Sequence, residues 1–283
     1  MTFVRFTLFC ADAVNEFLAR NCPYIAGAIS FYTLFSIFPL LLAIISVTGY
    51  VVGSRAEEEQ IRLAQSIADV IPVSSQYVSE NVQGVIRTRL FTGVASILGL
   101  LWAATLVFGA IRKGINAAWG IGRPRPFLRE RLIDFTLVLG AAIILLAAWF
   151  APVGLGVLQE VTAVLAPESE VFSNFLWRMI DALLLPALAF LTFLVLYTYL
   201  PNTDVRLRDA WHGALLGSLA FDLANLAFVW YVKNYAPYNL LYGSVSTILA
   251  FLTWVYLSAI IVLLGALVTS RYAAYAASIE TER

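Results

Sequence analysis

Residues 243–270 read GSVSTILAFLTWVYLSAIIVLLGALVTS, a run without a charged side chain. A helix of about 20 apolar residues crosses the roughly 30 Å hydrocarbon core of a bilayer. Predominantly apolar stretches of similar length precede this one at 24–52, 90–111, 132–151, 177–200 and 211–232. The sequence therefore predicts an all-α, polytopic membrane protein with six transmembrane helices, accompanied by interfacial amphipathic helices.

The composition of the whole chain supports this prediction. Of its 283 residues, 61% are hydrophobic and 13% are charged, and the mean hydropathy is +0.83. Soluble domains carry about 25% charged residues, so this chain has too little charge to cover a surface that faces water. The 18 basic residues are balanced by 18 acidic ones, which argues against nucleic acid as a partner.

The distribution of Arg and Lys predicts the orientation. With the N-terminus in the cytoplasm, cytoplasmic segments hold twelve Arg and Lys residues and the opposite segments hold six. The excess of basic residues on the cytoplasmic side places both termini there. We therefore expect a multi-pass protein of a cytoplasmic membrane.

The segments outside the spans predict further helices. Arg5, Asp12, Glu16 and Arg20 share one face of an N-terminal helix, which makes residues 1–23 an interfacial amphipathic segment. Residues 24–270 form the six-helix membrane domain, residues 53–89 an outer helical loop within it, and residues 271–283 a cytoplasmic tail. We expect no removable N-terminal signal, because charges interrupt the apolar residues before Tyr24.

Three stretches resemble the YihY/BrkB family. They are residues 26–42 (AGAISFYTLFSIFPLLL), Leu101-Trp102 with residues 116–120 (NAAWG), and the region from Tyr197 to Ala266 with its Tyr242-Gly243-Ser244 and Gly265-Ala266. The resemblance implies a six-helix bundle in the bacterial inner membrane and a part in envelope maintenance. Leu267 stands where many relatives carry a glutamate, so a role that needs this carboxylate does not transfer.

Asp222 is the most unusual residue of the predicted spans. It lies near the middle of the fifth span, where an ionised carboxylate costs about 2.5–3.5 kcal/mol. Asn225 follows one turn later on the same face. The pair is interpreted either as part of a polar transport cavity or as an interhelical hydrogen bond that holds the bundle together.

The first span carries a polar stripe. Ser30, Thr33 and Ser36 recur at every third residue, with Tyr32 beside them and Pro39 following. The stripe is a candidate lining of a transport pathway. Close packing between helices is the alternative, since small hydroxyl residues commonly serve it in membranes.

Two further groups are candidates for packing and for lipid contact. Gly213 and Gly217 form a GxxxG motif that lets another backbone approach, within the bundle or between protomers, and Gly243 opens the last span. The candidates for binding lipid headgroups are Arg178, Arg123, Arg125, Arg129 and Arg131. Positive-inside topology alone also explains the last four.

These features predict a protein that transports or flips a lipid or another amphiphile. A GxxxxGK[ST] motif is missing from the sequence, so we expect no direct use of ATP. We expect no enzyme activity, no catalytic residues, no metal site and no cofactor; the expected partners are membrane lipids and further copies in a homo-oligomer. The competing hypothesis is a non-transporting scaffold that assembles envelope partners.

Overall fold

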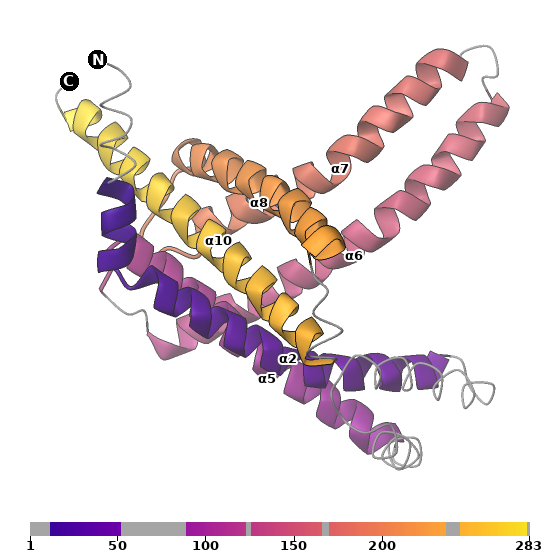
Figure 1. Ribbon diagram of the computed structural model, residues 1–283, viewed down its shortest axis with the longest axis horizontal. Coiled ribbons are helices and arrows are strands. Elements are labelled where there is room, and N and C mark those ends of the chain that lie inside the picture. The colour runs from indigo at the N-terminus through magenta and orange to yellow at the C-terminus, as the bar shows by residue number, and fades with distance from the viewer. Residues whose placement is uncertain (1–11, 52–88, 123–125, 166–169, 236–243, 282–283) are drawn as a thin grey trace. The chain divides into compact units, whose positions relative to one another are not determined.

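The structure, a computed structural model, describes residues 12–51, 89–122, 126–165, 170–235 and 244–281. Its long helices are α2 (Cys22–Val51), α5 (Arg89–Ala118), α6 (Phe127–Leu165), α7 (Glu170–Tyr199), α8 (Leu207–Tyr235) and α10 (Ser244–Thr281) (Figure 1). Each contains a stretch long and apolar enough to cross a membrane, and the described residues include no strand. The predicted fold class is confirmed.

Large apolar side chains are exposed on every one of these helices. Helices satisfy their own backbone hydrogen bonds, so they can present such side chains to lipid instead of a protein core. Examples are Phe31, Leu98, Leu146, Leu185, Leu223 and Leu249. This pattern is typical of spans whose outer faces meet acyl chains.

The helices extend beyond several of the predicted spans. Helix α5 continues to Ala118, and α6 runs for 39 residues from Phe127, whereas the sequence predicts spans at 90–111 and 132–151. Helix α10 continues to Thr281, so most of the predicted tail at 271–283 is helical. The added turns near the connection between α5 and α6 hold charged residues that pair with one another.

The predicted N-terminal helix falls partly within the described residues. Residues 12–19 are helical, and Asn21 adopts a positive φ of 55° before α2 begins at Cys22. Asparagine tolerates this left-handed conformation better than most residues. Residues 1–11 of this predicted segment, and the predicted outer loop up to residue 88, lie outside the described residues.

The chain divides into two compact units. Unit 1 comprises Met1–Cys22, Arg112–Asn225 and Ile261–Arg283, and unit 2 comprises Pro23–Ile111 and Leu226–Ile260. Helices α5, α8 and α10 contribute several residues to both, and α2 contributes Cys22 to unit 1 and its other residues to unit 2. The two units are described separately below.

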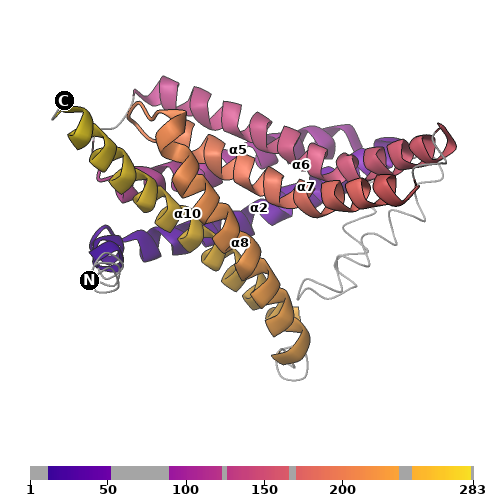
Figure 2. The same ribbon diagram turned by 90° about the horizontal axis from the view of Figure 1, so that it is seen from above.

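In unit 1, α6 and α7 lie side by side, as two views of the molecule agree (Figures 1 and 2). Tyr197 of α7 is fully buried, and its hydroxyl donates a hydrogen bond to the Val262 carbonyl of α10 at 2.8 Å. Phe193 stacks edge-on against Tyr197, one turn away. These aromatic side chains join α7 to α10 in the core of the unit.

Small side chains dominate the buried positions of unit 2. They are Ala26, Ser30, Ala43, Ser96, Ala103, Ala110 and Ala259. Residues of this size let helix backbones approach closely in a membrane. Pro39 of α2 packs opposite Gly99 of α5, where an added Cβ would meet the proline ring at 3.6 Å.

Candidate functional site

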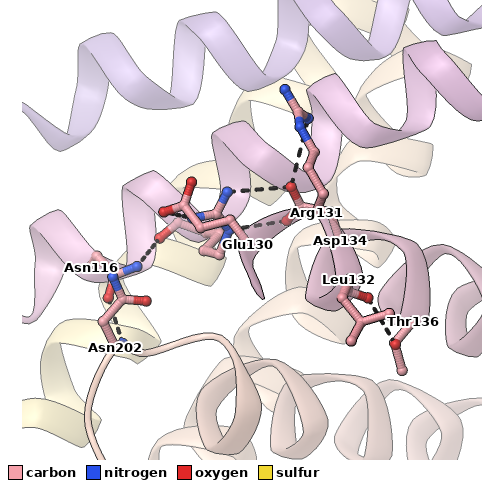
Figure 3. A network of polar contacts seen from close by, with 8 residues as sticks. Asn116, Glu130, Arg131, Leu132, Asp134, Thr136 and Asn202 are labelled. Carbon is pink, nitrogen blue, oxygen red and sulfur yellow. Dashed lines mark hydrogen bonds and ion pairs between the residues drawn. The ribbon is translucent and has the colours of Figure 1, made fainter. Parts of the chain in front are cut away.

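The connection between α5 and α6 brings charged residues of the two helices together. Helix α5 ends at Ala118 and α6 begins at Phe127, so Arg112 and Asp134 lie at similar distances from the turn. Glu130 lies one turn before Asp134 on α6. These three side chains, of which Arg112 and Asp134 are buried and Glu130 is half-buried, form a group that we name the Arg112 cluster (Figure 3).

Arg112 binds both carboxylates of this cluster. Its Nε donates to Asp134 Oδ1 at 3.0 Å and its Nη2 to Asp134 Oδ2 at 3.3 Å, while Nη1 donates to Glu130 Oε1 at 2.6 Å. The side chain of Arg112 is 5% exposed and that of Asp134 is 0% exposed. The planar guanidinium fits this two-pronged arrangement, which an ammonium group cannot reproduce.

Asn116 connects the cluster to the segment between α7 and α8. Its Nδ2 donates to the Arg112 carbonyl at 2.9 Å, and its Oδ1 accepts from the Asn202 backbone N–H at 2.7 Å. Figure 3 shows these contacts continuing the line of polar side chains that begins at Asp134. The amide thus fixes the connection after α7 against the end of α5.

A cavity of about 220 Å³ lies beside these residues. Its walls carry both signs of charge and two side-chain amides. The lining residues are Arg112, Lys113, Asn116, Ala117, Ile121, Gly122, Glu130 and Asn202. Lys113 and Gly122 are exposed, so the cavity opens to the surface of unit 1.

A second charged group joins the N-terminal helix to α5 and α10. The Arg20 guanidinium donates to the carbonyl of Ala118, the last residue of α5, and pairs with Glu16. Glu16 also accepts from Arg271 Nε at 2.7 Å. A cation at the C-terminal end of a helix meets the negative end of its dipole, so Arg20 stabilises the end of α5.

The polar face predicted for the N-terminal helix therefore contacts protein as well as solvent. Glu16 and Arg20 are half-buried in these contacts, whereas Asp12 is exposed. Phe17 on the apolar side is 6% exposed, so it packs within the protein. Val14 and Leu18 are exposed and are available to a membrane surface.

The structure places Asp222 on α8, half-buried, with Asn225 exposed one turn later. Neither residue lines the cavity beside the Arg112 cluster. Asp222 therefore remains a candidate through its position within a span.

The polar stripe of α2 bonds to its own helix. The Ser30 hydroxyl donates to the Ala26 carbonyl at 2.9 Å, Thr33 to Ile29 at 2.8 Å, and Ser36 to Thr33 at 2.7 Å. Ser30 is buried, whereas Tyr32, Thr33, Ser36 and Pro39 are half-buried. The hydroxyls are satisfied without a ligand.

The GxxxG glycines are in close contact with neighbouring helices of unit 1. A Cβ at Gly213 would overlap Thr269 of α10, and one at Gly217 would come within 2.7 Å of the Phe193 ring of α7. Both contacts lie within one copy of the chain. Gly243 lies outside the described residues.

The predicted headgroup arginines divide into three groups. Arg129 and Arg131 are exposed on α6, and Arg131 Nη1 lies 3.9 Å from Asp134 Oδ2. Arg123 and Arg125 lie outside the described residues. Arg178 lies near the N-terminal end of α7.

Sequence reasoning missed Arg112, Glu130, Asp134 and Asn202 as site residues, and met Asn116 only within a family motif. The predicted span ends at Ile111, which makes Arg112 a loop residue. In the structure, carboxylate partners allow Arg112 to lie within helix α5. The usable signal was the short connection between α5 and α6. Antiparallel helices joined in this way place residues at equal distances from the turn next to each other.

Comparisons with known proteins match nearly the whole chain. The family model described as virulence factor BrkB matches residues 13–282. A UPF0761 membrane protein of Alkalilimnicola ehrlichii is 30% identical over 96% of this chain and 59% of its own length. A UPF0761 membrane protein of Aeromonas salmonicida is 28% identical, over 91% of this chain and 86% of its own length.

Another relative carries a different kind of name. The protein YfkH of Bacillus subtilis, named ribonuclease-like, is 25% identical over 94% of this chain and 93% of its own length. Among the described residues, no three His, Cys, Asp or Glu side chains group as they would to hold a metal ion. No solved structure matches the chain.

Proposed function

This chain belongs to the virulence factor BrkB family, and from that premise we propose that it transports or flips a lipid or another amphiphile across the bacterial inner membrane for envelope maintenance. The observation that carries the proposal is the polar cavity beside the Arg112 cluster. It lies at the ends of apolar helices whose outer faces suit acyl chains. An amphiphile needs both environments next to each other.

The rest of the proposal follows from the sequence. We propose that both termini and the cavity face the cytoplasm, because the distribution of Arg and Lys favours that orientation. We propose that transport uses no direct ATP, needs no cofactor and involves no enzyme activity. Either a proton gradient acting through Asp222 or a lipid gradient would drive it. The partners would be membrane lipids and other copies of the chain.

A translocation assay with a blocked cavity tests this function. The full chain is reconstituted in liposomes with a fluorescent phospholipid, and movement between leaflets is followed by quenching of the outer leaflet. Gly122 lines the cavity and has nothing within 4 Å of an added Cβ, so Gly122→Trp places an indole in the opening. We expect this variant to translocate the phospholipid at a rate about tenfold lower than that of the unaltered protein.

The matched control is Gly140→Trp on α6. Gly140 also has nothing within 4 Å of an added Cβ, and it does not line the cavity. We expect it to keep the rate of the unaltered protein. Absence of protein-dependent translocation under any ion or lipid gradient would refute the transport proposal.

The competing proposal is a membrane scaffold that assembles envelope partners. It is favoured by the polar stripe, whose hydroxyls bond to their own helix, and by the small buried residues of unit 2. Under this proposal, Asp222→Asn and Ser36→Ala preserve function, whereas Gly217→Leu disrupts the packing of α8 against α7 and, with it, assembly. A loss of translocation in Asp222→Asn, with Asp204→Asn unchanged and both variants equally expressed, would exclude the scaffold.

A further inference from the structure

The charges of the residues that line the cavity beside the Arg112 cluster, taken together with that of Asp134, cancel. Arg112 and Lys113 supply positive charge on its wall, and Glu130 supplies negative charge. Asp134 adds a second negative charge directly behind Arg112. A site for an anion would carry an excess of positive charge, so this balance favours a ligand without net charge.

Two of these groups have bonding capacity left for a ligand. All three nitrogens of the Arg112 guanidinium donate to carboxylates. Lys113, by contrast, is exposed and forms no ion pair with any residue that the structure describes. Glu130 uses Oε1 for Arg112, which leaves Oε2. The cavity therefore presents an ammonium group and a carboxylate oxygen to a ligand that carries both signs of charge.

The volume of the cavity limits the size of that ligand. About 220 Å³ is far more than the roughly 10–15 Å³ of probe volume that one water molecule needs. It is less than the roughly 300–1,000 Å³ of sites that enclose drug-sized molecules. The cavity can thus hold a headgroup, while acyl chains stay outside against the apolar helix faces.

We propose that this cavity binds a zwitterionic aminophosphate group, with the phosphate on Lys113 and the primary amine on Glu130. This inference rests on the proposed function, because it names the headgroup class that the transported amphiphile carries. Both contacts are charge-assisted hydrogen bonds, which are stronger than those between neutral groups. Exchanging either charge alters the preference between a zwitterion and an anion.

A binding experiment on the purified full chain tests the proposal. The probes are phosphatidylethanolamine and phosphatidylglycerol with identical acyl chains, and affinities are measured by native mass spectrometry from detergent. We expect the unaltered chain to prefer phosphatidylethanolamine about tenfold, and Lys113→Met to lower that affinity about tenfold. Glu130→Gln gives the cavity a net positive charge, so we expect it to favour phosphatidylglycerol.

The chain supplies a matched control, since Lys233 is its second lysine and is exposed on the part of α8 that belongs to unit 2. Lys233→Met should leave both affinities unchanged. Equal binding of the two lipids, with a ratio that neither cavity variant changes, overturns the proposal. Equal effects of Lys113→Met and Lys233→Met also overturn it. If Glu130→Gln fails to fold, exposed Lys113 still provides the test.

Competition with soluble phosphoethanolamine shows whether the ligand is a lipid headgroup or a soluble aminophosphate. If it displaces the lipid at concentrations close to those of the lipid itself, the site serves a soluble aminophosphate; if it does not, the site serves a lipid headgroup. The result is independent of the translocation assay. Selective binding without translocation refutes transport alone, and translocation without headgroup selectivity refutes this inference alone.

Discussion

Arg112 is stable in its buried position only because Asp134 and Glu130 surround it. Taking a guanidinium out of water costs several kcal/mol, and the bonds to two carboxylates offset that cost. Asp134 contributes two of the three bonds and is itself fully buried. Each charge is therefore tolerated mainly through the other, and the loss of Asp134 leaves the buried Arg112 with Glu130 alone.

Asp134→Leu should destabilise the protein by about 3–5 kcal/mol, because it leaves Arg112 buried without its main partner. The double variant Arg112→Met/Asp134→Leu removes both charges and should recover much of that loss. Thermal unfolding of the purified protein in detergent measures both. Arg131→Ala is the control, since Arg131 is exposed and reaches Asp134 at 3.9 Å. A double variant less stable than Asp134→Leu would contradict this account.

The helices of unit 1 pack through glycines at specific contacts. Gly217 of α8 faces Phe193 and Tyr197 of α7, and Gly265 of α10 faces the Tyr197 hydroxyl. Tyr197 thus lies between two helices that approach it through glycine. The buried ring and its hydrogen bond to Val262 depend on this space.

Gly217→Ala should lower the free energy of unfolding by about 1–3 kcal/mol, because overpacked cores shift at that cost. The new Cβ would come within 2.7 Å of Phe193 Cδ1 and 3.1 Å of the Tyr197 hydroxyl. Gly140→Ala is the matched control, in open space on α6. It should stabilise its helix by about 0.5–1 kcal/mol. Thermal unfolding of both purified variants measures the difference. If Gly217→Ala is as stable as Gly140→Ala, α8 does not pack as described.

The six helices could be predicted because each contains an apolar run that only a membrane span or a buried core explains. Their ends could not, because a charged residue usually marks the point where a span leaves the membrane. Arg112 continues α5 through a partner 22 residues further along the chain. Asn116 acquires its role from Asn202, 86 residues away. Such pairings depend on how the helices meet, which the pattern of apolar residues does not specify.

The distribution of basic residues along the whole chain predicts which side of the membrane the cavity faces. The cavity, the N-terminal helix and the end of α10 all belong to unit 1. The segments assigned to the cytoplasm carry twice as many basic residues as the opposite ones. We propose on this basis that the cavity takes headgroups from the cytoplasmic leaflet, where the exposed Arg129 and Arg131 add positive charge.

Thiol labelling of intact cells tests this orientation. In a background with Cys10→Ser and Cys22→Ser, single cysteines are introduced as Thr203→Cys, between α7 and α8, or Glu168→Cys, between α6 and α7. We expect an impermeant maleimide to label position 168 in intact cells and position 203 only after the inner membrane is permeabilised. The reason is that basic residues in the connection between α5 and α6 and in the connection between α7 and α8 keep both connections on the cytoplasmic side. Labelling of position 203 in intact cells would show that the orientation is the opposite one. The cavity would then face the outer leaflet of that membrane.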